Sequence, residues 1–188
     1  MSDKEVLSGR GRKPDTELRS ALLLGATGLV GSRCLEILLN RPDYSEVTVL
    51  TRRPLDRQHP HLRQHIVEDF DRLEEDAELN EWAYRVSDLY ISFGTTIRKA
   101  GSQELFRRID LDYPLVVARA CANAGVGHAA LVSSIAADAT SRNFYLRTKG
   151  QLEDALLELP FATISIVRPS VILGERPDSR ILERLGQA

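Results

Sequence analysis

The sequence predicts an α/β fold, a doubly wound parallel sheet with helices on both faces. Two observations support this prediction. Short apolar runs rich in β-branched residues alternate along the chain with segments of helical periodicity, and a glycine-rich turn joins the first apolar run to the first helical segment. With 188 residues, of which 43% are hydrophobic, the chain is long enough for one domain with a substantial core.

The expected elements follow one another in the order strand, helix, strand. Strands are expected at residues 20–24, 46–51, 64–67, 88–93, 128–133 and 161–167, each short enough to be a buried parallel strand. Helices are expected at residues 28–40, 103–124 and 145–159. Pro42 and Pro160 follow the first and last helices as stop signals, and Pro114 should break or kink the middle helix near Asp112.

The remaining segments are polar. Residues 1–18 are expected to form a disordered tail, and the acidic stretch 69–81 is interpreted as a mobile, solvated helix face. The loop 52–65 contains three histidines, but without a cysteine or carboxylate pattern beside them we interpret it as a surface loop. Cys34 and Cys121 fit two small buried side chains, so neither a disulfide nor a metal site is expected.

The charge balance restricts the possible partners. The chain has 25 Lys and Arg against 27 Asp and Glu, a formal charge of −2, which argues against general nucleic-acid binding. Residues 10–14 (RGRKP) resemble a minor-groove hook, but a single short hook would bind weakly, so we interpret them as part of the tail. The sequence has neither the apolar core of a signal peptide nor a run long enough to span a membrane. These features predict a soluble, cytoplasmic protein without membrane contact.

The strongest functional signal is the turn Gly25-Ala26-Thr27-Gly28-Leu29-Val30-Gly31, between the first strand and the first helix. Glycines there remove the Cβ atoms that would block a tight turn, a pyrophosphate and close packing of helix on strand, and the helix N-terminus offers free N–H groups to phosphates. A purely structural turn is the alternative. The flanking elements favour a dinucleotide-binding Rossmann domain over residues 19–188, with cofactor contacts from Gly25, Thr27, Gly28, Leu29, Val30 and Gly31.

The end of the second strand indicates which dinucleotide is bound. An NAD enzyme usually has an Asp or Glu there for the ribose 2′-hydroxyl, whereas this chain has Arg52 and Arg53. Two guanidiniums suit a 2′-phosphate and favour NADP(H); a basic surface loop is the alternative. Asp69 and Phe70 follow the third strand and are expected near the adenine. Phe93, Gly94 and Thr95 follow the fourth strand and are expected beneath the ribose and nicotinamide.

The catalytic candidates come later in the chain. Tyr145 and Lys149 are four residues apart, so a helix that begins by Tyr145 projects both from one face, and Ser133 and Ser134 end the preceding strand. An ammonium near a phenol favours the phenolate, which allows proton exchange at neutral pH, and the same lysine can hold the ribose hydroxyls. A serine hydroxyl can orient a substrate carbonyl. A solvated Tyr–Lys pair, common by chance, is the alternative.

Together these residues resemble the short-chain dehydrogenase/reductases of the extended or atypical kind, and within them the branch around the Tat-interacting oxidoreductase. The resemblance covers nearly all of residues 21–180. It rests on the glycine turn and on Thr51-Arg52-Arg53, Phe93-Gly94-Thr95-Thr96, Lys99-Ala100-Gly101, Ser133-Ser134, Tyr145 to Lys149, Arg168-Pro169-Ser170 and Asp178-Ser179-Arg180. It implies that Tyr145 donates or accepts the proton with Lys149 as its partner. It also implies NADPH contacts from Arg52, Arg53, Phe93, Gly94, Arg168, Pro169, Ile172 and Arg180.

One departure from the family concerns the substrate side. Members of this family usually continue well past the Arg-Pro motif and build part of the substrate pocket there, whereas this chain ends at Ala188, so we expect a short or truncated substrate part. The expected function is an NADP(H)-dependent oxidoreductase acting on a carbonyl or alcohol of an unknown small molecule. The alternative is a non-catalytic NADP(H)-binding sensor or regulatory protein. A monomer or a homodimer is expected.

Overall fold

A computed structural model describes residues 18–83 and 85–170. Six parallel strands form one sheet in the order β3-β2-β1-β4-β5-β6. These strands are β1 (Arg19–Leu24), β2 (Tyr44–Thr51), β3 (Leu62–Ile66), β4 (Asp88–Ile91), β5 (His128–Val132) and β6 (Thr163–Val167). The predicted parallel sheet is confirmed. The expected tail, Ile172 and Arg180 lie outside the described residues, apart from Leu18, which is exposed.

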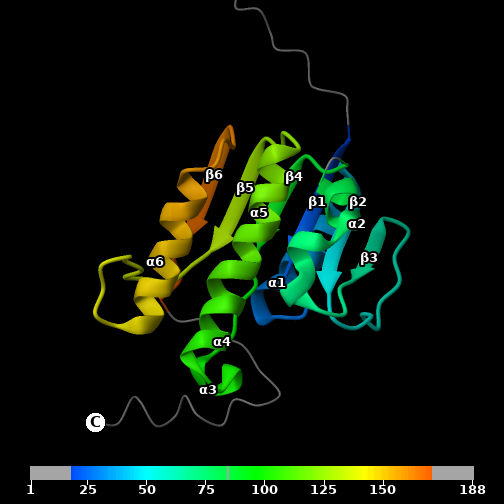
Figure 1. Ribbon diagram of the computed structural model, residues 1–188. Coiled ribbons are helices and arrows are strands. Elements are labelled where there is room, and N and C mark those ends of the chain that lie inside the picture. Colours follow the sequence, from blue (N-terminus) through cyan, green and yellow to red (C-terminus); the bar gives the residue numbers. More distant parts are fainter. Residues whose placement is uncertain (1–17, 84, 171–188) are drawn as a thin grey trace, which may run out of the picture.

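Helices cover both faces of the sheet, as predicted. They are α1 (Leu29–Asn40), the 3-10 helix η1 (Phe70–Glu75), α2 (Ala77–Ala83), α3 (Ile97–Ala100), α4 (Gln103–Arg107), the π-helical turn η2 (Arg108–Asp112), α5 (Tyr113–Asn123) and α6 (Phe144–Leu157). Figure 1 shows α2, α5 and α6 side by side across one face. Along β1 the side chains alternate between the faces, so that Ala21 and Leu23 pack with α1, whereas Leu22 and Leu24 pack with α2, α5 and α6. All four are fully buried, which explains the continuous apolar run of this strand.

The acidic stretch 69–81 presents the solvated helix face that the sequence predicted, but its apolar positions also belong to the core. It forms η1 and most of α2, and it buries Phe70 and Leu73 from η1 and Leu79 from α2 in the core shared with α5 and α6. Asp69 caps η1, because its side chain accepts a hydrogen bond from the backbone N–H of Asp71 at 2.9 Å. The acidic residues are solvated, but the apolar positions between them anchor the segment.

The helical stretch before β5 is interrupted where the proline predicted it. Residues 103–123 form α4, η2 and α5 in succession, with Pro114 in the first turn of α5. At the interruption the Tyr113 N–H donates to the carbonyl of Arg108, five residues earlier. Because Pro114 has no N–H to donate to the carbonyl of Asp110, the ordinary four-residue pattern cannot continue through this point. The wider turn buries Asp110 and Leu111.

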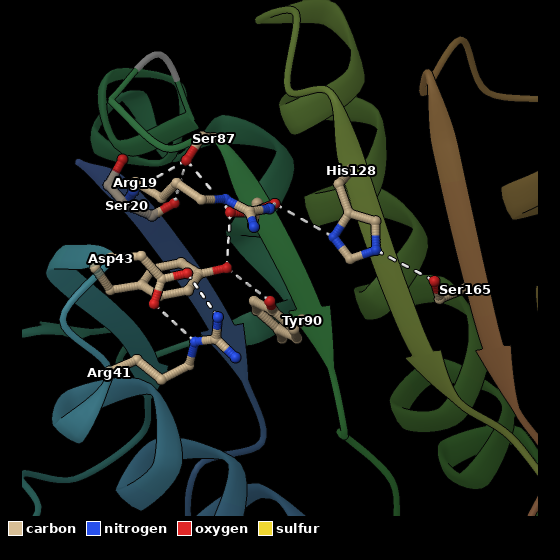
Figure 2. Close-up of polar contacts among 10 residues, drawn as sticks. Arg19, Ser20, Arg41, Asp43, Ser87, Tyr90, His128 and Ser165 are labelled. Atoms are coloured by element: carbon tan, nitrogen blue, oxygen red, sulfur yellow. Dashed lines mark hydrogen bonds and ion pairs between the residues drawn. The ribbon is translucent and has the colours of Figure 1, made fainter. Parts of the chain in front are cut away.

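A polar network closes the amino edge of the sheet (Figure 2). The Asp88 side chain is 1% exposed, forms an ion pair with Arg19 and lies 3.3 Å from Nδ1 of His128. It also accepts a hydrogen bond from the Tyr44 hydroxyl at 2.9 Å, and that hydroxyl lies 2.8 Å from the hydroxyl of Tyr90. These contacts link β1, β2, β4 and β5 at one edge. The opposite, carboxyl edge remains available for a binding site.

The order of the strands creates a crevice at the carboxyl edge. From β1 the chain passes through α1 to β2 on one side, whereas from β4 it passes through α5 to β5 on the other side and the other face. The connections that follow β1 and β4 therefore diverge, and ligands of open α/β sheets bind in the crevice at such a switch point.

The structure also bears on membrane, metal and disulfide chemistry. Within residues 18–83 and 85–170, no helix is long and apolar enough to cross a membrane, and no three His, Cys, Asp or Glu side chains are grouped so that they could hold a metal ion. Cys34 and Cys121 are free thiols, and burial raises the pKa of the Cys121 thiol to about 12.

Candidate functional site

The glycine turn follows β1, and its three glycines differ in how much space the structure leaves for a side chain. Gly25 has φ +95°, in the left-handed region, and a Cβ there would lie 2.6 Å from the carbonyl carbon of Ser92. A Cβ at Gly31 would lie 2.0 Å from the carbonyl oxygen of Gly25, so glycine is required for α1 to pack against the turn. A Cβ at Gly28 would meet its nearest atom, the same carbonyl oxygen, at 3.4 Å. Gly28 is therefore the glycine of the turn whose Cβ the protein itself could accommodate.

The N-terminus of α1 forms one wall of the crevice. Gly28 precedes the helix in an extended conformation, and no acidic residue lies in the first turn. The N–H groups of this turn have no helical partners, and the positive end of the helix dipole lies with them. This wall suits a phosphate or pyrophosphate group.

The crevice is a cleft of about 750 Å³ at the carboxyl edge of the sheet. Four separate segments that the sequence predicted for one site meet there. From those predictions the lining includes Thr27, Gly28, Leu29, Val30, Phe93, Gly94, Thr95, Ser133, Tyr145 and Lys149. The cleft is also lined by Ser32, Ser92, Thr96, Ile97, Lys99, Asp110 and Val132, which the sequence analysis did not single out as site residues.

Helix α6 presents Tyr145 and Lys149 to the cleft. Its N-terminus is capped by Asn143, whose side-chain oxygen accepts a hydrogen bond from the Leu146 N–H at 3.1 Å, so Tyr145 lies in the first turn. The Tyr145 ring packs at a tilt against the fully buried Phe106, with ring centroids 5.8 Å apart. Tyr145 is half-buried and Lys149 is only 5% exposed. A solvated surface pair, the alternative interpretation, does not fit this burial.

The two serines after β5 differ in their surroundings. Ser133 is 6% exposed and lines the cleft, and its hydroxyl has no hydrogen-bond partner in the described part of the chain. The Ser134 hydroxyl donates to the carbonyl of Ile135 at 3.3 Å, and Ser134 is not among the residues that line the cleft. Because a buried hydroxyl without a partner is costly, Ser133 is the serine suited to a ligand.

Among the lining residues that sequence reasoning missed, Asp110 is the one in contact with a predicted catalytic residue. It is fully buried in η2, and its Oδ1 lies 2.7 Å from the Lys149 Nζ. Burial raises the pKa of the Asp110 carboxyl, and the Lys149 ammonium opposes that rise. An aspartate between Ile109 and Leu111, four residues before a proline, was the available signal. The linear pattern does not distinguish Asp110 from Glu104 and Asp112, the other acidic residues of this helical stretch.

Several expected cofactor residues lie outside this cleft. Arg52 and Arg53 are exposed just past the carboxyl end of β2, and Asp69 is exposed as the cap of η1. Phe70 is 6% exposed and stacks on Phe93 with ring centroids 5.4 Å apart, so it belongs to the core. Arg168 is bound to the buried Glu153 of α6 through hydrogen bonds from Nε at 3.0 and 3.1 Å.

Phe70 and Arg168 also have contacts within the protein, and their expected roles toward a cofactor remain predictions. The ring of Phe70 fills the space beside Phe93, and the guanidinium of Arg168 ties β6 to α6. Pro169 follows in the chain, and its carbonyl accepts a hydrogen bond from the Ile135 N–H at 3.0 Å. Through these contacts, Phe70 and Pro169 touch residues that follow β4 and β5, respectively.

The residues of the cleft fit a dinucleotide. A tight glycine turn with an open position at Gly28 and the free N–H groups of α1 suit a pyrophosphate. The unpartnered hydroxyl of Ser133, the Tyr145 phenol and the Lys149 ammonium lie where the strands β4 and β5 end, on the other side of the switch point. The cleft thus has groups suited to a phosphate on one side and groups whose chemistry allows proton exchange on the other.

Two relatives from different organisms match most of this chain. Protein FMP52, mitochondrial, from Candida albicans is 39% identical over 161 residues, which are 85% of this chain and 70% of that protein. Protein HTATIP2 from Rattus norvegicus is 36% identical over 184 residues, 96% of this chain and 74% of that protein. These matches confirm the resemblance found in the sequence motifs.

The expectation of a cytoplasmic protein is contradicted by these relatives. The FMP52 proteins of Candida albicans, Lodderomyces elongisporus and Meyerozyma guilliermondii are named as mitochondrial. The expectation rested on the missing apolar core of a secretory signal. That feature is uninformative here, because mitochondrial transit peptides are amphipathic and rich in arginine rather than apolar.

Solved structures and a family model agree on the fold. MoeE5 in complex with UDP-glucuronic acid and NAD superposes with a TM-score of 0.65 at 21% identity, and the match covers 85% of this chain but 57% of that one. The UDP-glucuronic acid 4-epimerase of Bacillus cereus in complex with NAD superposes with a TM-score of 0.65 at 15% identity, and that match covers 85% of this chain and 60% of that one. This chain thus spans under two thirds of these structures.

The model of the NAD-dependent epimerase/dehydratase family matches residues 21–166. The chain belongs to the NAD-dependent epimerase/dehydratase family.

Proposed function

We propose that this protein is an NADP(H)-dependent oxidoreductase of the short-chain dehydrogenase/reductase type, acting on a carbonyl or alcohol group of a small molecule. The observation that supports it best is that Ser133, Tyr145 and Lys149 line the same cleft as the glycine turn and the N-terminus of α1. A dinucleotide held by the turn would extend toward these three side chains.

Each side chain has a role that follows from its chemistry. Reduction of a carbonyl requires a hydride at carbon, which NADPH would supply when bound, and a proton at oxygen. The Tyr145 hydroxyl would donate that proton, and the Lys149 ammonium would stabilise the phenolate that remains. The Ser133 hydroxyl would hydrogen-bond the carbonyl oxygen and hold it in place. In alcohol oxidation the phenolate would accept the proton instead.

This function is tested by measuring NADPH oxidation, through its absorbance, with a panel of aldehydes, ketones and quinones. We expect oxidation above background with at least one class. If a protein that binds NADPH oxidises it with none of them, the catalytic role is contradicted, and a non-catalytic NADP(H)-binding protein becomes the better account.

The preference for NADP(H) is proposed from Arg52 and Arg53. Both are exposed past the end of β2, the strand next to β1 and its glycine turn. Within the described part of the chain, no carboxylate pairs with either guanidinium, so both are available for an anionic group. A 2′-phosphate is such a group, and it is present only in NADP(H).

Replacing both arginines with alanine is expected to remove most of the preference for NADPH over NADH. The loss of charge-assisted hydrogen bonds should weaken NADPH binding by about 1 to 3 kcal/mol and leave NADH binding almost unchanged. Calorimetry with both nucleotides measures this. The matched control, Arg33→Ala with Arg63→Ala, removes the same charge from side chains that are 76% and 50% exposed. Equal affinities of the unmodified protein for the two nucleotides would refute the assignment.

A further inference from the structure

Asp110 is the acidic residue that lines the cleft, and its burial requires an explanation. Its side chain is 1% exposed, although an isolated carboxylate in the interior is strongly disfavoured. It projects from the π-helical turn η2, and turns of this kind occur often at functional sites. The turn brings the carboxylate to the cleft between β4 and α6.

Two groups on different elements contact this carboxylate. Its Oδ1 lies 2.7 Å from the Nζ of Lys149 on α6, and its Oδ2 accepts a hydrogen bond from the Thr95 N–H at 2.8 Å. The loop after β4 and the helix that presents Tyr145 are thus joined through one side chain. Both groups belong to the set that the sequence predicted for the cofactor.

Gly94 allows the pair to approach this loop closely. A Cβ at this position would lie 2.9 Å from the Oδ1 of Asp110 and 3.3 Å from the Nζ of Lys149. The absence of a side chain therefore leaves the space that the ion pair occupies. The backbone of this loop, the Asp110 carboxylate and the Lys149 ammonium therefore pack directly against one another.

We propose that Asp110 is the positioning residue of the site, holding the Lys149 ammonium and the Thr95 backbone in the arrangement that binding and proton transfer require. This inference rests on the proposed function. Asp110 acts through Lys149: its negative charge compensates the buried ammonium, and because its other oxygen is fixed by the Thr95 N–H, it restricts where the ammonium can lie. Without it, Lys149 would be a buried cation with no ionic partner, an arrangement that proteins avoid.

The other ionisable groups around Lys149 are few. On α6 they are Tyr145, one turn before it, and Glu153, one turn after it, which is bound to Arg168. The segments after β4 and β5 contribute Gly94, Thr95 and Ser133, none of which is charged, and Lys99 also lines the cleft. Asp110 is thus the carboxylate in direct contact with the ammonium, and its removal should dominate any change in the titration of Lys149.

The test uses the cofactor-free protein with ¹³C at the ε-carbon of lysine. The sequence has only four lysines, at positions 4, 13, 99 and 149, so the Lys149 resonance can be identified as the one missing from a Lys149→Arg variant. In Asp110→Asn, which keeps the size of the side chain and an acceptor for Thr95, the titration midpoint of the Lys149 amine is expected to fall by about one pH unit or more. In the control Asp112→Asn, which changes a half-exposed carboxylate two residues away, it should not move.

A second measurement links this shift to binding. Asp110→Asn should weaken NADPH about ten-fold in calorimetry, the effect of one charge-assisted hydrogen bond, and Asp112→Asn should not. An unchanged Lys149 titration in Asp110→Asn would overturn the positioning role, whatever the activity. A shifted titration in a protein that neither binds nor oxidises NADPH would instead reject the proposed function and leave the ion pair in place.

If Asp110→Asn does not fold, the proposal can be tested by a pH titration of the unmodified protein. Because one carboxylate contacts both groups, the Lys149 ε-carbon and Thr95 amide resonances should shift with a common midpoint as Asp110 is protonated. Burial raises the pKa of this carboxyl, which moves its protonation toward conditions where the protein is folded. Two different midpoints, or no shift of either resonance, would overturn the proposal.

Discussion

Replacing Tyr145 with phenylalanine is expected to lower turnover about 10²- to 10⁴-fold and to leave NADPH affinity almost unchanged, because the phenol acts only in the transition state. The substitution removes one oxygen and keeps the ring, whose packing against Phe106 holds the start of α6. The fold and the nucleotide site should therefore remain intact. Turnover is measured with the substrate class that the panel identifies, and affinity by calorimetry.

Two further variants make this result specific. Lys149→Ala should reduce both turnover and NADPH affinity, because the ammonium is proposed to hold the ribose and to stabilise the phenolate. Ser134→Ala is the matched control, since Ser134 follows Ser133 but does not line the cleft, and it should change neither quantity. Activity that survives in Tyr145→Phe would mean that another group handles the proton, and Ser133 would be the first to examine.

The sequence was sufficient to predict the sheet and the groups that meet at its carboxyl edge. Parallel strands buried on both faces leave continuous apolar runs, such as that of β1, and the carboxyl ends of such strands lie together whatever the distance between them along the chain. The glycine turn, Phe93, Ser133 and Tyr145 could therefore be assigned to one cleft before any distance was known. Their roles toward a cofactor remain predictions.

Other features depended on contacts that a linear pattern does not contain. The linear pattern did not show that the ring of Phe70, predicted beside the adenine, packs in the core next to Phe93. Nor did it show that Arg168, predicted at the cofactor, has a buried partner in Glu153, fifteen residues earlier on a neighbouring helix. Asp110 became a candidate only when the π-helical turn placed it beside Lys149. In each case the deciding partner comes from a different element of the fold.

The glycine turn allows a prediction that separates binding from folding. Gly28→Val is expected to reduce dinucleotide binding at least about 100-fold, because the side chain would occupy the space proposed for the pyrophosphate. The protein itself should accept the substitution. Gly28 has φ −77° and ψ 167°, an extended conformation that suits valine, and its Cβ would be 3.4 Å from the nearest atom. The melting temperature should therefore fall by no more than a few degrees.

The contrasting variant is Gly31→Ala, three residues further along the same turn. Its single added methyl group would lie 2.0 Å from the carbonyl oxygen of Gly25 and 2.5 Å from the Oγ of Ser92, so α1 would have to move away from the sheet. We expect a loss of stability of several kcal/mol, seen as a strongly lowered melting temperature or an unfolded protein, as for other overpacked positions. Thermal unfolding and calorimetry on both variants test the pair. If Gly28→Val unfolds the protein while Gly31→Ala is tolerated, the turn packs differently from this structure; if Gly28→Val binds NADPH as well as the unmodified protein, the pyrophosphate lies elsewhere.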